Sequence, residues 1–203
     1  MSVITFPSTL RVSRSTWSQI RLDLAFSSVF GSQGVEVSGP LWGVTLEAPD
    51  MLETESGDWQ AFLMNMRGQT NQVALWNTGR SAPRGTMRGT MTLNTAAVQG
   101  ATILSIIAAT EATKTLKAGD LIGLGTGIIQ QVVMVTADTT ANGSGLITVT
   151  VEPALRNSHL INAAVTWDKP KALFRRKQSE ASWDYANIIA RGFAVELIED
   201  VRA

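Results

Sequence analysis

The sequence predicts a mainly β fold: a discontinuous β-sandwich with one amphipathic helix, carrying an inserted small β-barrel or sandwich domain. Most of the 203-residue chain consists of short segments that alternate apolar and polar residues, as half-buried strands do. One segment alone has a helical period, and charge becomes scarce after residue 85. We therefore expect residues 1–85 and 171–203 to form the sandwich and residues 86–170 to form the inserted domain. An insertion between strands costs little, because loop-closure entropy grows slowly with loop length.

The first third of the chain contains the strands expected at the start of the sandwich. Residues 9–13, 41–46 and 72–76 are short strand candidates. Residues 17–26, WSQIRLDLAF, alternate most regularly, which predicts a strand with one buried and one wet face. The apolar side of this strand consists of Ile20, Leu22, Leu24 and Phe26. The turns expected after it are marked by Gly31, Gly34 and Gly39.

Residues 54–67 form the expected helix. Four apolar side chains fall at i, i+3, i+4 and i+7 and so share one face, which we interpret as a set of core anchors rather than a ligand site. These anchors are Trp59, Phe62, Leu63 and Met66. Thr54 is the expected N-cap, Arg67 lies in the expected last turn, and Gly68 is expected at the left-handed position after it. A lone helix of this length is marginal in water, so we expect its apolar face to cover the neighbouring strands.

The region from 86 to 170 reads as closely spaced short strands joined by glycine-rich turns, the pattern of a small barrel or sandwich. The strand candidates are Thr86–Leu93, Thr102–Ile107, Asp120–Leu124, Ile128–Thr136, Leu146–Val151 and Ala164–Trp167. The sequences KAGD at 117–120 and ANGSG at 141–145 are turn signals. The run 108–115 fits neither a strand nor a helix clearly. After Pro170, residues 182–189 and 192–198 are the last two strand candidates.

The composition excludes several classes of site. Seventeen basic and seventeen acidic residues cancel, whereas proteins that live on nucleic acid usually carry a basic excess. The chain has no cysteine and one histidine, His159, so thiolate metal sites are excluded and a serine triad is disfavoured. No segment reaches the roughly 18 apolar residues of a membrane span, and the N-terminus lacks the pattern of a secretory signal. We therefore expect a protein made in a cytoplasm, without a cofactor or metal and without enzymatic activity.

Two motifs resemble ligand loops but favour turns. Gly123, Gly125 and Gly127 imitate a nucleotide-binding pattern, but a β-branched run follows them instead of the helix that would hold phosphate. Residues 138–145 have oxygen side chains spaced loosely like a calcium loop, yet they lack its alternating acidic residues and distal glutamate. We interpret both segments as connections between strands.

One basic run, formed by Arg175, Arg176 and Lys177, stands out near the C-terminus. We interpret it as a basic surface patch or a subunit contact, with nucleic-acid contact as the alternative. The six tryptophans are spread evenly along the chain, which favours cores and interfaces over a single aromatic platform. A sugar-binding face on the 86–170 domain remains a further alternative.

The chain resembles the distal tail protein family of long-tailed bacteriophages. The resemblance rests on local sequences in a shared order along nearly the whole chain. In the first half they are FSSVFGSQ, GPLWGVTLEAPDM, the helix WQAFLMNMRGQTNQVAL and the loop SAPRGT. In the second half they are KAGDLIGLG, QVVMVTADTTANGSGLITVTVEPALR, DKPKALFRR and SWDYANIIARGFAVELIED.

The resemblance implies a structural protein of the virion, located at the tail tip. Members of this family form a homohexameric ring whose sandwich and helix build the ring, while the second domain projects outward. The ring joins the tail tube protein to the hub proteins, and its lumen surrounds the tape measure protein and then the passing DNA. Three other functions stay open from the residues alone: a head–tail connector, a tail terminator, and a module that binds host polysaccharide.

Overall fold

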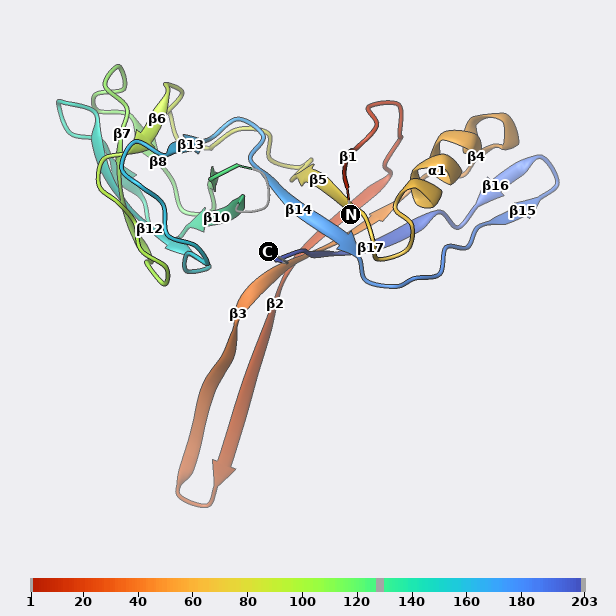
Figure 1. Ribbon diagram of the computed structural model, residues 1–203, viewed down its shortest axis with the longest axis horizontal. Coiled ribbons are helices and arrows are strands. Elements are labelled where there is room, and N and C mark those ends of the chain that lie inside the picture. Colours follow the sequence, from red (N-terminus) through yellow and green to blue (C-terminus); the bar gives the residue numbers. More distant parts are fainter. Residues whose placement is uncertain (1, 127–129, 202–203) are drawn as a thin grey trace. The chain divides into compact units, whose positions relative to one another are not determined.

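The structure is a computed structural model and describes residues 2–126 and 130–201. Strands make up 47% of the chain and helix 7%, which confirms the predicted mainly β class with a small inserted barrel. The chain divides into two compact units, shown in Figure 1. Unit 1 comprises Met1–Ile20, Leu41–Leu75 and Leu173–Arg202, and unit 2 contains Arg21–Pro40 and Trp76–Ala172. The chain therefore crosses between the units at 20/21, 40/41, 75/76 and 172/173, whereas the predicted division has boundaries at 85/86 and 170/171 and keeps residues 21–40 with the sandwich.

A six-stranded sheet is the framework of unit 1. Its order is β1-β5-β14-β17-β3-β2. The strands are β1 Val3–Thr5, β5 Gln72–Trp76, β14 Lys171–Arg176, β17 Ala194–Glu199, β3 Gly31–Glu47 and β2 Arg14–Ser28. The pair β1–β5 is parallel, and β17 pairs antiparallel with both β14 and β3. The first and last parts of the sequence therefore meet in one sheet, with β14 and β17 lying between β5 and β3.

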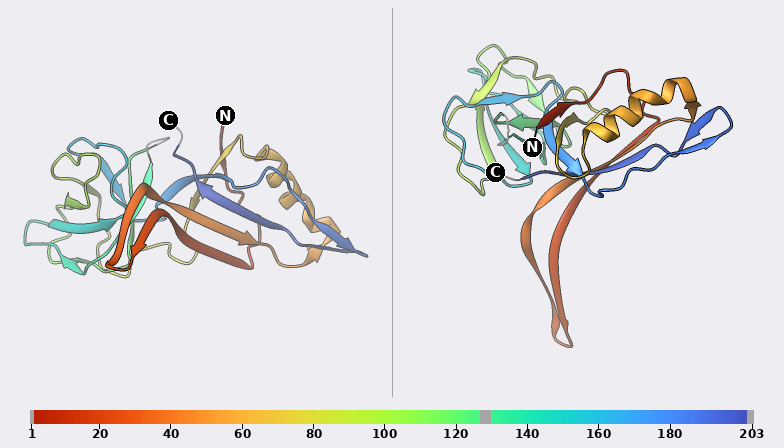
Figure 2. Two further views of the ribbon diagram at one scale, coloured as in Figure 1. Left: turned by 90° about the horizontal axis from the view of Figure 1, so that it is seen from below. Right: turned by 45° about the vertical axis from the view of Figure 1, so that its right-hand side comes forward.

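The helix α1 (Glu53–Asn65) follows strand β4 (Met51–Leu52) directly, and Figure 2 shows it alongside the strands of its unit. β4 belongs to a second sheet of three strands, with β15 (Asp184–Ala186) and β16 (Ile189–Arg191). All four predicted anchors of the helix are buried, none more than 2% exposed. The Trp59 ring lies 6.1 Å from the Phe62 ring and 6.4 Å from the Phe193 ring, and its Nε1 donates to the Arg11 carbonyl at 3.1 Å.

The ends of the helix differ from the prediction. Leu52, not Thr54, is the N-cap, and it makes no side-chain capping bond. The first helical N–H, that of Glu53, instead donates to the Ile188 carbonyl at 2.9 Å. The helix ends before Arg67, which takes the left-handed conformation with φ 49° one residue earlier than predicted. Gly68 is left-handed as well, with φ 62°.

Unit 2 contains a closed barrel of six short strands in the order β10-β12-β7-β6-β13-β9. The strands are β6 Met91–Leu93, β7 Ile103–Ile107, β9 Leu121–Leu124, β10 Gln131–Val135, β12 Leu146–Glu152 and β13 Ala164–Thr166. Every neighbouring pair is antiparallel. A separate two-stranded sheet pairs β8 (Thr115–Leu116) with β11 (Thr139–Thr140). Leucine, isoleucine, valine and methionine side chains from all six barrel strands fill one continuous core.

Several strand predictions were wrong in their extent. The strand expected at Thr86–Leu93 begins only at Met91, because the N–H groups of residues 84 and 85 donate to the Asp120 side chain and those of residues 86 and 87 donate to Thr115. Residues 9–13 form no strand, and β1 lies earlier. Residues 182–189 do not run as one strand; they turn at Asn187, whose φ is 57°, into the hairpin β15–β16. The strand β14 was not predicted at all. Residues 128–129 of the candidate Ile128–Thr136 lie outside the described residues.

The largest difference concerns the two long strands. The sequence predicts turns at Gly31, Gly34 and Gly39, but only Gly31 lies at a turn, with φ 146°. Gly34 and Gly39 are inside β3, which runs without interruption from residue 31 to residue 47. As a result β2 and β3 form one long two-stranded ribbon, seen clearly in Figure 1.

Candidate functional site: an exposed amphipathic arm

The outer half of this ribbon is the candidate functional site. We call residues Arg21–Pro40 the arm. The two strands are joined by a tight turn at Val29 and Phe30. The Ser28 hydroxyl fixes the turn, because it accepts from the Phe30 N–H at 3.2 Å and donates to the Gly31 carbonyl at 3.3 Å. The arm is therefore a β-hairpin with a well-defined tip.

One face of the arm is polar. A guanidinium nitrogen of Arg21 on β2 lies 3.6 Å from a carboxylate oxygen of Glu36 on β3. The two side chains must lie on the same face for their charged ends to meet. Because successive side chains of a strand point to opposite faces, the residues on either side of them share the other face.

That other face is apolar and exposed. Leu22, Leu24 and Phe26 alternate along β2 and are 51–60% exposed. Val35 and Val37, which flank Glu36, are 44% and 52% exposed on β3. The sequence predicts that the apolar side of 17–26 is buried. For Ile20, Leu22, Leu24 and Phe26, which are 40–60% exposed, this prediction was wrong. Alternation identified the face correctly, but the described part of the chain does not cover it.

The tip adds two more apolar side chains. Val29 and Phe30 are almost fully exposed, at 98% and 99%. A shallow hollow of about 330 Å³ opens beside them, lined by Phe26, Phe30 and the small or polar residues between 27 and 33. No ionisable side chain occurs from residue 24 to residue 35. The outer half of the arm is therefore an uncharged surface.

Physical chemistry makes such an arm unusual for a free monomer. The seven exposed apolar residues present on the order of 800 Å² of surface, taking ~150–250 Å² for a fully exposed phenylalanine and less for valine and leucine. Soluble monomers rarely expose contiguous apolar patches larger than a few hundred Å². An isolated two-stranded hairpin is also only marginally stable in water. Both facts indicate that the arm is made to be covered by another surface.

The predicted basic patch does not exist as a unit. Arg175 and Arg176 are successive residues of β14 and so point to opposite sides of the sheet. Arg176 is buried, which lowers the pKa of its guanidinium, and it donates to the Glu180 carbonyl. Lys177 is exposed and lies 3.4 Å from the Glu196 carboxylate. Strand alternation thus separates three charges that are adjacent in sequence.

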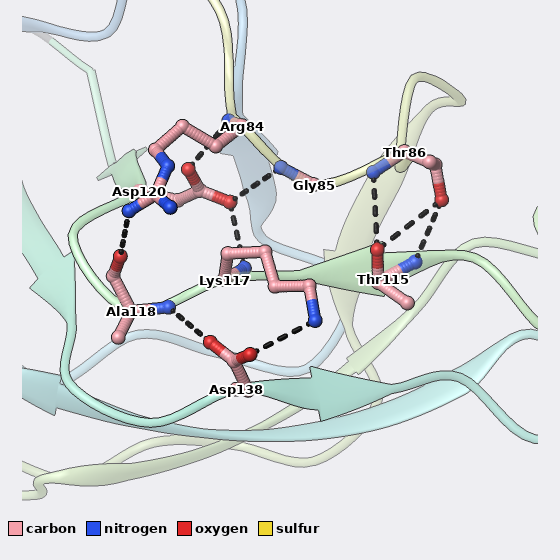
Figure 3. Close-up of polar contacts among 8 residues, drawn as sticks. All are labelled: Arg84, Gly85, Thr86, Thr115, Lys117, Ala118, Asp120 and Asp138. Atoms are coloured by element: carbon pink, nitrogen blue, oxygen red, sulfur yellow. Dashed lines mark hydrogen bonds and ion pairs between the residues drawn. The ribbon is translucent and has the colours of Figure 1, made fainter.

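A second polar cluster lies in unit 2, around the buried carboxylate of Asp120 (Figure 3). One of its oxygens accepts from the Arg84 N–H at 2.6 Å, and the other accepts from the N–H groups of Gly85 at 3.0 Å and Lys117 at 2.7 Å. The Arg84 guanidinium in turn donates to the Ala118 carbonyl at 3.3 Å. This carboxylate ties the loop after β5 to the turn before β9, which is a structural task. Among the described residues, no group of three metal-ligating side chains is found.

The segment considered as a calcium loop is committed to internal bonds. Asp138 accepts from the Ala118 N–H at 2.9 Å and from the Lys117 ammonium at 2.8 Å, and the Lys117 bond in particular lowers the pKa of this carboxyl. The Asn142 side-chain oxygen accepts from the N–H groups of Ser144 and Leu146. Within the glycine motif, Gly123 pairs with Val132 in the barrel, and Gly127 lies outside the described residues.

No protein-family model matches the chain, and no curated protein is significantly similar to it. No helix in residues 2–126 and 130–201 is long and apolar enough to cross a membrane.

The arm is the feature that sequence reasoning missed. The sequence does contain a sign of the arm. The alternating segment 17–26 runs directly into residues 24–35, which carry no charge, and no other apolar segment was predicted to pack on this face.

Proposed function

We propose that this protein is a structural subunit of a phage tail tip, of the distal tail protein class, which assembles with copies of itself through the arm. The observation that carries the proposal is the exposed apolar face of the arm. The tail-tip placement rests on the sequence resemblance described above. In that setting the ring joins the tail tube protein to the hub and tape measure proteins, with six copies as in the family it resembles, and DNA passes through the lumen.

Among the described residues, the apolar face of the arm has no surface that covers it. Burying apolar surface stabilises association by about 25 cal/mol per Å² before the costs of ordering and lost freedom are subtracted. The arm's apolar surface is of the size that one partner contributes to a standard interface, about 800 Å². Its polar face carries Arg21, Asp23 and Glu36, and the Arg21 guanidinium forms ion pairs with Glu36 and with Glu152 of β12. One face therefore suits a partner and the other suits water. A subunit of an assembly needs such a division, whereas an isolated domain does not.

Assembly through the arm is tested by two matched double variants. Leu24→Glu with Phe26→Glu places two carboxylates on the apolar face. Ala25→Glu with Gly34→Glu places the same charges on the opposite face of the arm, at two positions that do not line the hollow at its tip. Light scattering after size-exclusion chromatography should show oligomers for the natural chain and for the second variant, and monomers for the first. A natural chain that stays monomeric at all concentrations, or a first variant that still assembles, overturns self-assembly through the arm.

The tail-tip placement needs its own experiment. Antibody labelling of virions and electron microscopy locate the polypeptide in its particle. We expect the label at the distal end of the tail tube. A label on the capsid or at the neck would transfer the chain to the connector or terminator class, even if the arm drives assembly there.

A further inference from the structure

A second uncharged apolar surface lies on the barrel, where two loops meet. Ala97 and His159 form an isolated antiparallel bridge, with N–H to carbonyl distances of 2.9 and 2.8 Å. The Gln99 N–H donates to the Ser158 hydroxyl at 3.0 Å and strengthens the same junction. The two loops are therefore held to each other and present a fixed outer surface.

This surface carries three exposed aliphatic side chains. Ala97 and His159 point inward and are buried, so the residues beside the bridge, Val98 and Leu160, point outward. Val98 is 67% exposed and Leu160 is 80% exposed, and Ile161 follows in the next turn at 57%. We call these three residues the loop patch. It amounts to roughly 400 Å², the size of the largest patch on a typical monomer, which often has a function.

The loop patch matches the arm in electrostatic character. Residues 94–101 and 157–164 contain no aspartate, glutamate, lysine or arginine. The only ionisable side chain in them is His159, whose burial lowers its pKa and keeps the imidazole neutral near pH 7. Contact between this patch and the uncharged end of the arm leaves no buried charge unpaired, which is the main cost that interfaces avoid.

We infer that the loop patch of one copy receives the arm tip of a second copy. The inference rests on the proposed function, because a closed ring of more than two copies needs two different surfaces on each subunit. Contact between two arms would be symmetric and would end at a dimer. The arm and the loop patch supply the two surfaces that a head-to-tail contact requires. The barrel then takes part in the ring contact, in addition to the sandwich and helix that the family resemblance implies. The hollow between Phe26 and Phe30 offers a site for the most exposed side chain of the patch, Leu160.

Unit 1 offers a competing apolar surface that fits less well. Ile188 and Leu52 are 65% and 46% exposed; Leu52 pairs with Ile189 of β16, and Ile188 lies in the turn just before that strand. Charged residues surround them: Glu53 follows Leu52 directly, and Arg191 forms an ion pair with Asp50 at 3.2 Å. An uncharged arm tip docked there would desolvate the Glu53 carboxylate and the Arg191–Asp50 pair without supplying any new partner for them. The loop patch has no such neighbours in sequence.

Mixing two defective variants tests the inference. The arm variant, Leu24→Glu with Phe26→Glu, keeps its loop patch, and a patch variant, Leu160→Glu with Ile161→Glu, keeps its arm. Each alone should be monomeric, since an unpaired carboxylate buried in an interface weakens binding about 100-fold or more. An equimolar mixture should form a dimer and nothing larger, because only one functional arm and one functional patch meet. A patch variant that assembles like the natural chain overturns this inference and leaves the proposed function standing. An arm variant that assembles overturns the proposed function itself.

Cross-linking provides a test that does not depend on losing assembly. The natural chain has no cysteine, so Phe30→Cys and Leu160→Cys each introduce a single thiol. Under mild oxidation, a mixture of the two variants should give far more disulfide dimer than either variant alone. Ile188→Cys in place of Leu160→Cys is the matched control. Dimers from Phe30→Cys alone, or from Phe30→Cys with Ile188→Cys but not Leu160→Cys, would overturn the pairing.

Discussion

Strand β12 of the barrel and strand β2 of the arm have the same alternation of apolar and polar residues, but the apolar face is buried in β12 and exposed in β2. In β12, Ile147 and Val149 point into the barrel and are at most 1% exposed. In β2, Leu22 and Leu24 are more than half exposed. The comparison shows that alternation predicts an apolar face but not which molecule covers it. A face without cover inside its own chain is a candidate interface.

The difference follows from the number of neighbours. β12 pairs with β7 on one side and β10 on the other, and closure of the barrel turns all six strands onto a shared core. Among the described strands, the outer parts of β2 and β3 pair only with each other, and a two-stranded ribbon has no interior. Five substitutions test this comparison, from the largest expected effect on stability to the smallest.

The most severe effect is expected inside the barrel. Val149→Asp places a carboxylate in a core without a polar partner, and we expect a loss of about 5 kcal/mol or more, enough to unfold unit 2. Thr148→Asp is the control, because its side chain is exposed on the outer face of the same strand. Circular dichroism and urea unfolding report both. A folded Val149→Asp protein would mean that the barrel interior admits water and that the contrast with the arm is false.

A smaller loss of stability is expected in unit 1. The apolar face of the helix is buried there, unlike the apolar face of the arm. Trp59 is 1% exposed and its indole N–H is bonded to Arg11. Trp59→Ala should cost about 3–5 kcal/mol, by lost transfer energy and the cavity that remains. Met64→Ala on the exposed side of the same helix serves as control, since Met64 is 54% exposed. Equal melting temperatures for the two variants would refute the buried helix face.

The sequence predicts more of the fold than of the candidate site. The periods of 54–67 and of the barrel strands are local, so the helix face and most barrel strands could be assigned from them. Partners that lie far away in sequence decided the rest. Helix capping by the Ile188 carbonyl, the short strand β1 paired with β5, and the loop held by Asp120 each depend on a segment more than 30 residues away. The arm required knowing that Gly34 and Gly39 do not interrupt β3.

An intermediate effect is expected at Asp120. In Asp120→Asn an amide N–H₂ replaces one acceptor oxygen and faces N–H groups that it cannot bond. We expect a loss of about 2–3 kcal/mol, the cost of buried donors left unsatisfied. Asp138→Asn is the matched control, because Asp138 is exposed to solvent, and its effect on the melting temperature should be clearly smaller. Equal shifts for both variants would show that the loop at 84–85 does not depend on the buried carboxylate.

A modest pH dependence is expected from His159. Burial lowers its pKa below the ordinary value of 6.5, so between these two pKa values the unfolded chain binds a proton that the folded chain does not. Stability should therefore be complete above about pH 6.5 and decline as the pH falls below it. Asp138 does not contribute in this window, because its pKa lies below 3.8 and its effect is lost only at lower pH. In thermal unfolding from about pH 7.5 to about pH 5, His159→Gln should lose less stability than the natural chain. Parallel curves would contradict this account.

The smallest effect on stability is expected on the arm. The test compares the loss of a leucine side chain from the exposed arm with the same loss from the barrel core. Leu24→Ala removes the same kind of side chain whose loss from a protein core costs about 2–5 kcal/mol. In the monomer Leu24 is more than half exposed, so the unfolding free energy should change by no more than about 0.5 kcal/mol. Leu104→Ala in β7, where the side chain is 1% exposed, gives the contrasting core value. Chemical unfolding at dilute and at high protein concentration separates the two states. If the arm is an interface, the variant should match the natural chain when dilute and fall behind it when concentrated, because association stabilises only the chain whose arm can bind. A large loss in the dilute monomer would instead mean that the arm is part of the chain's own core.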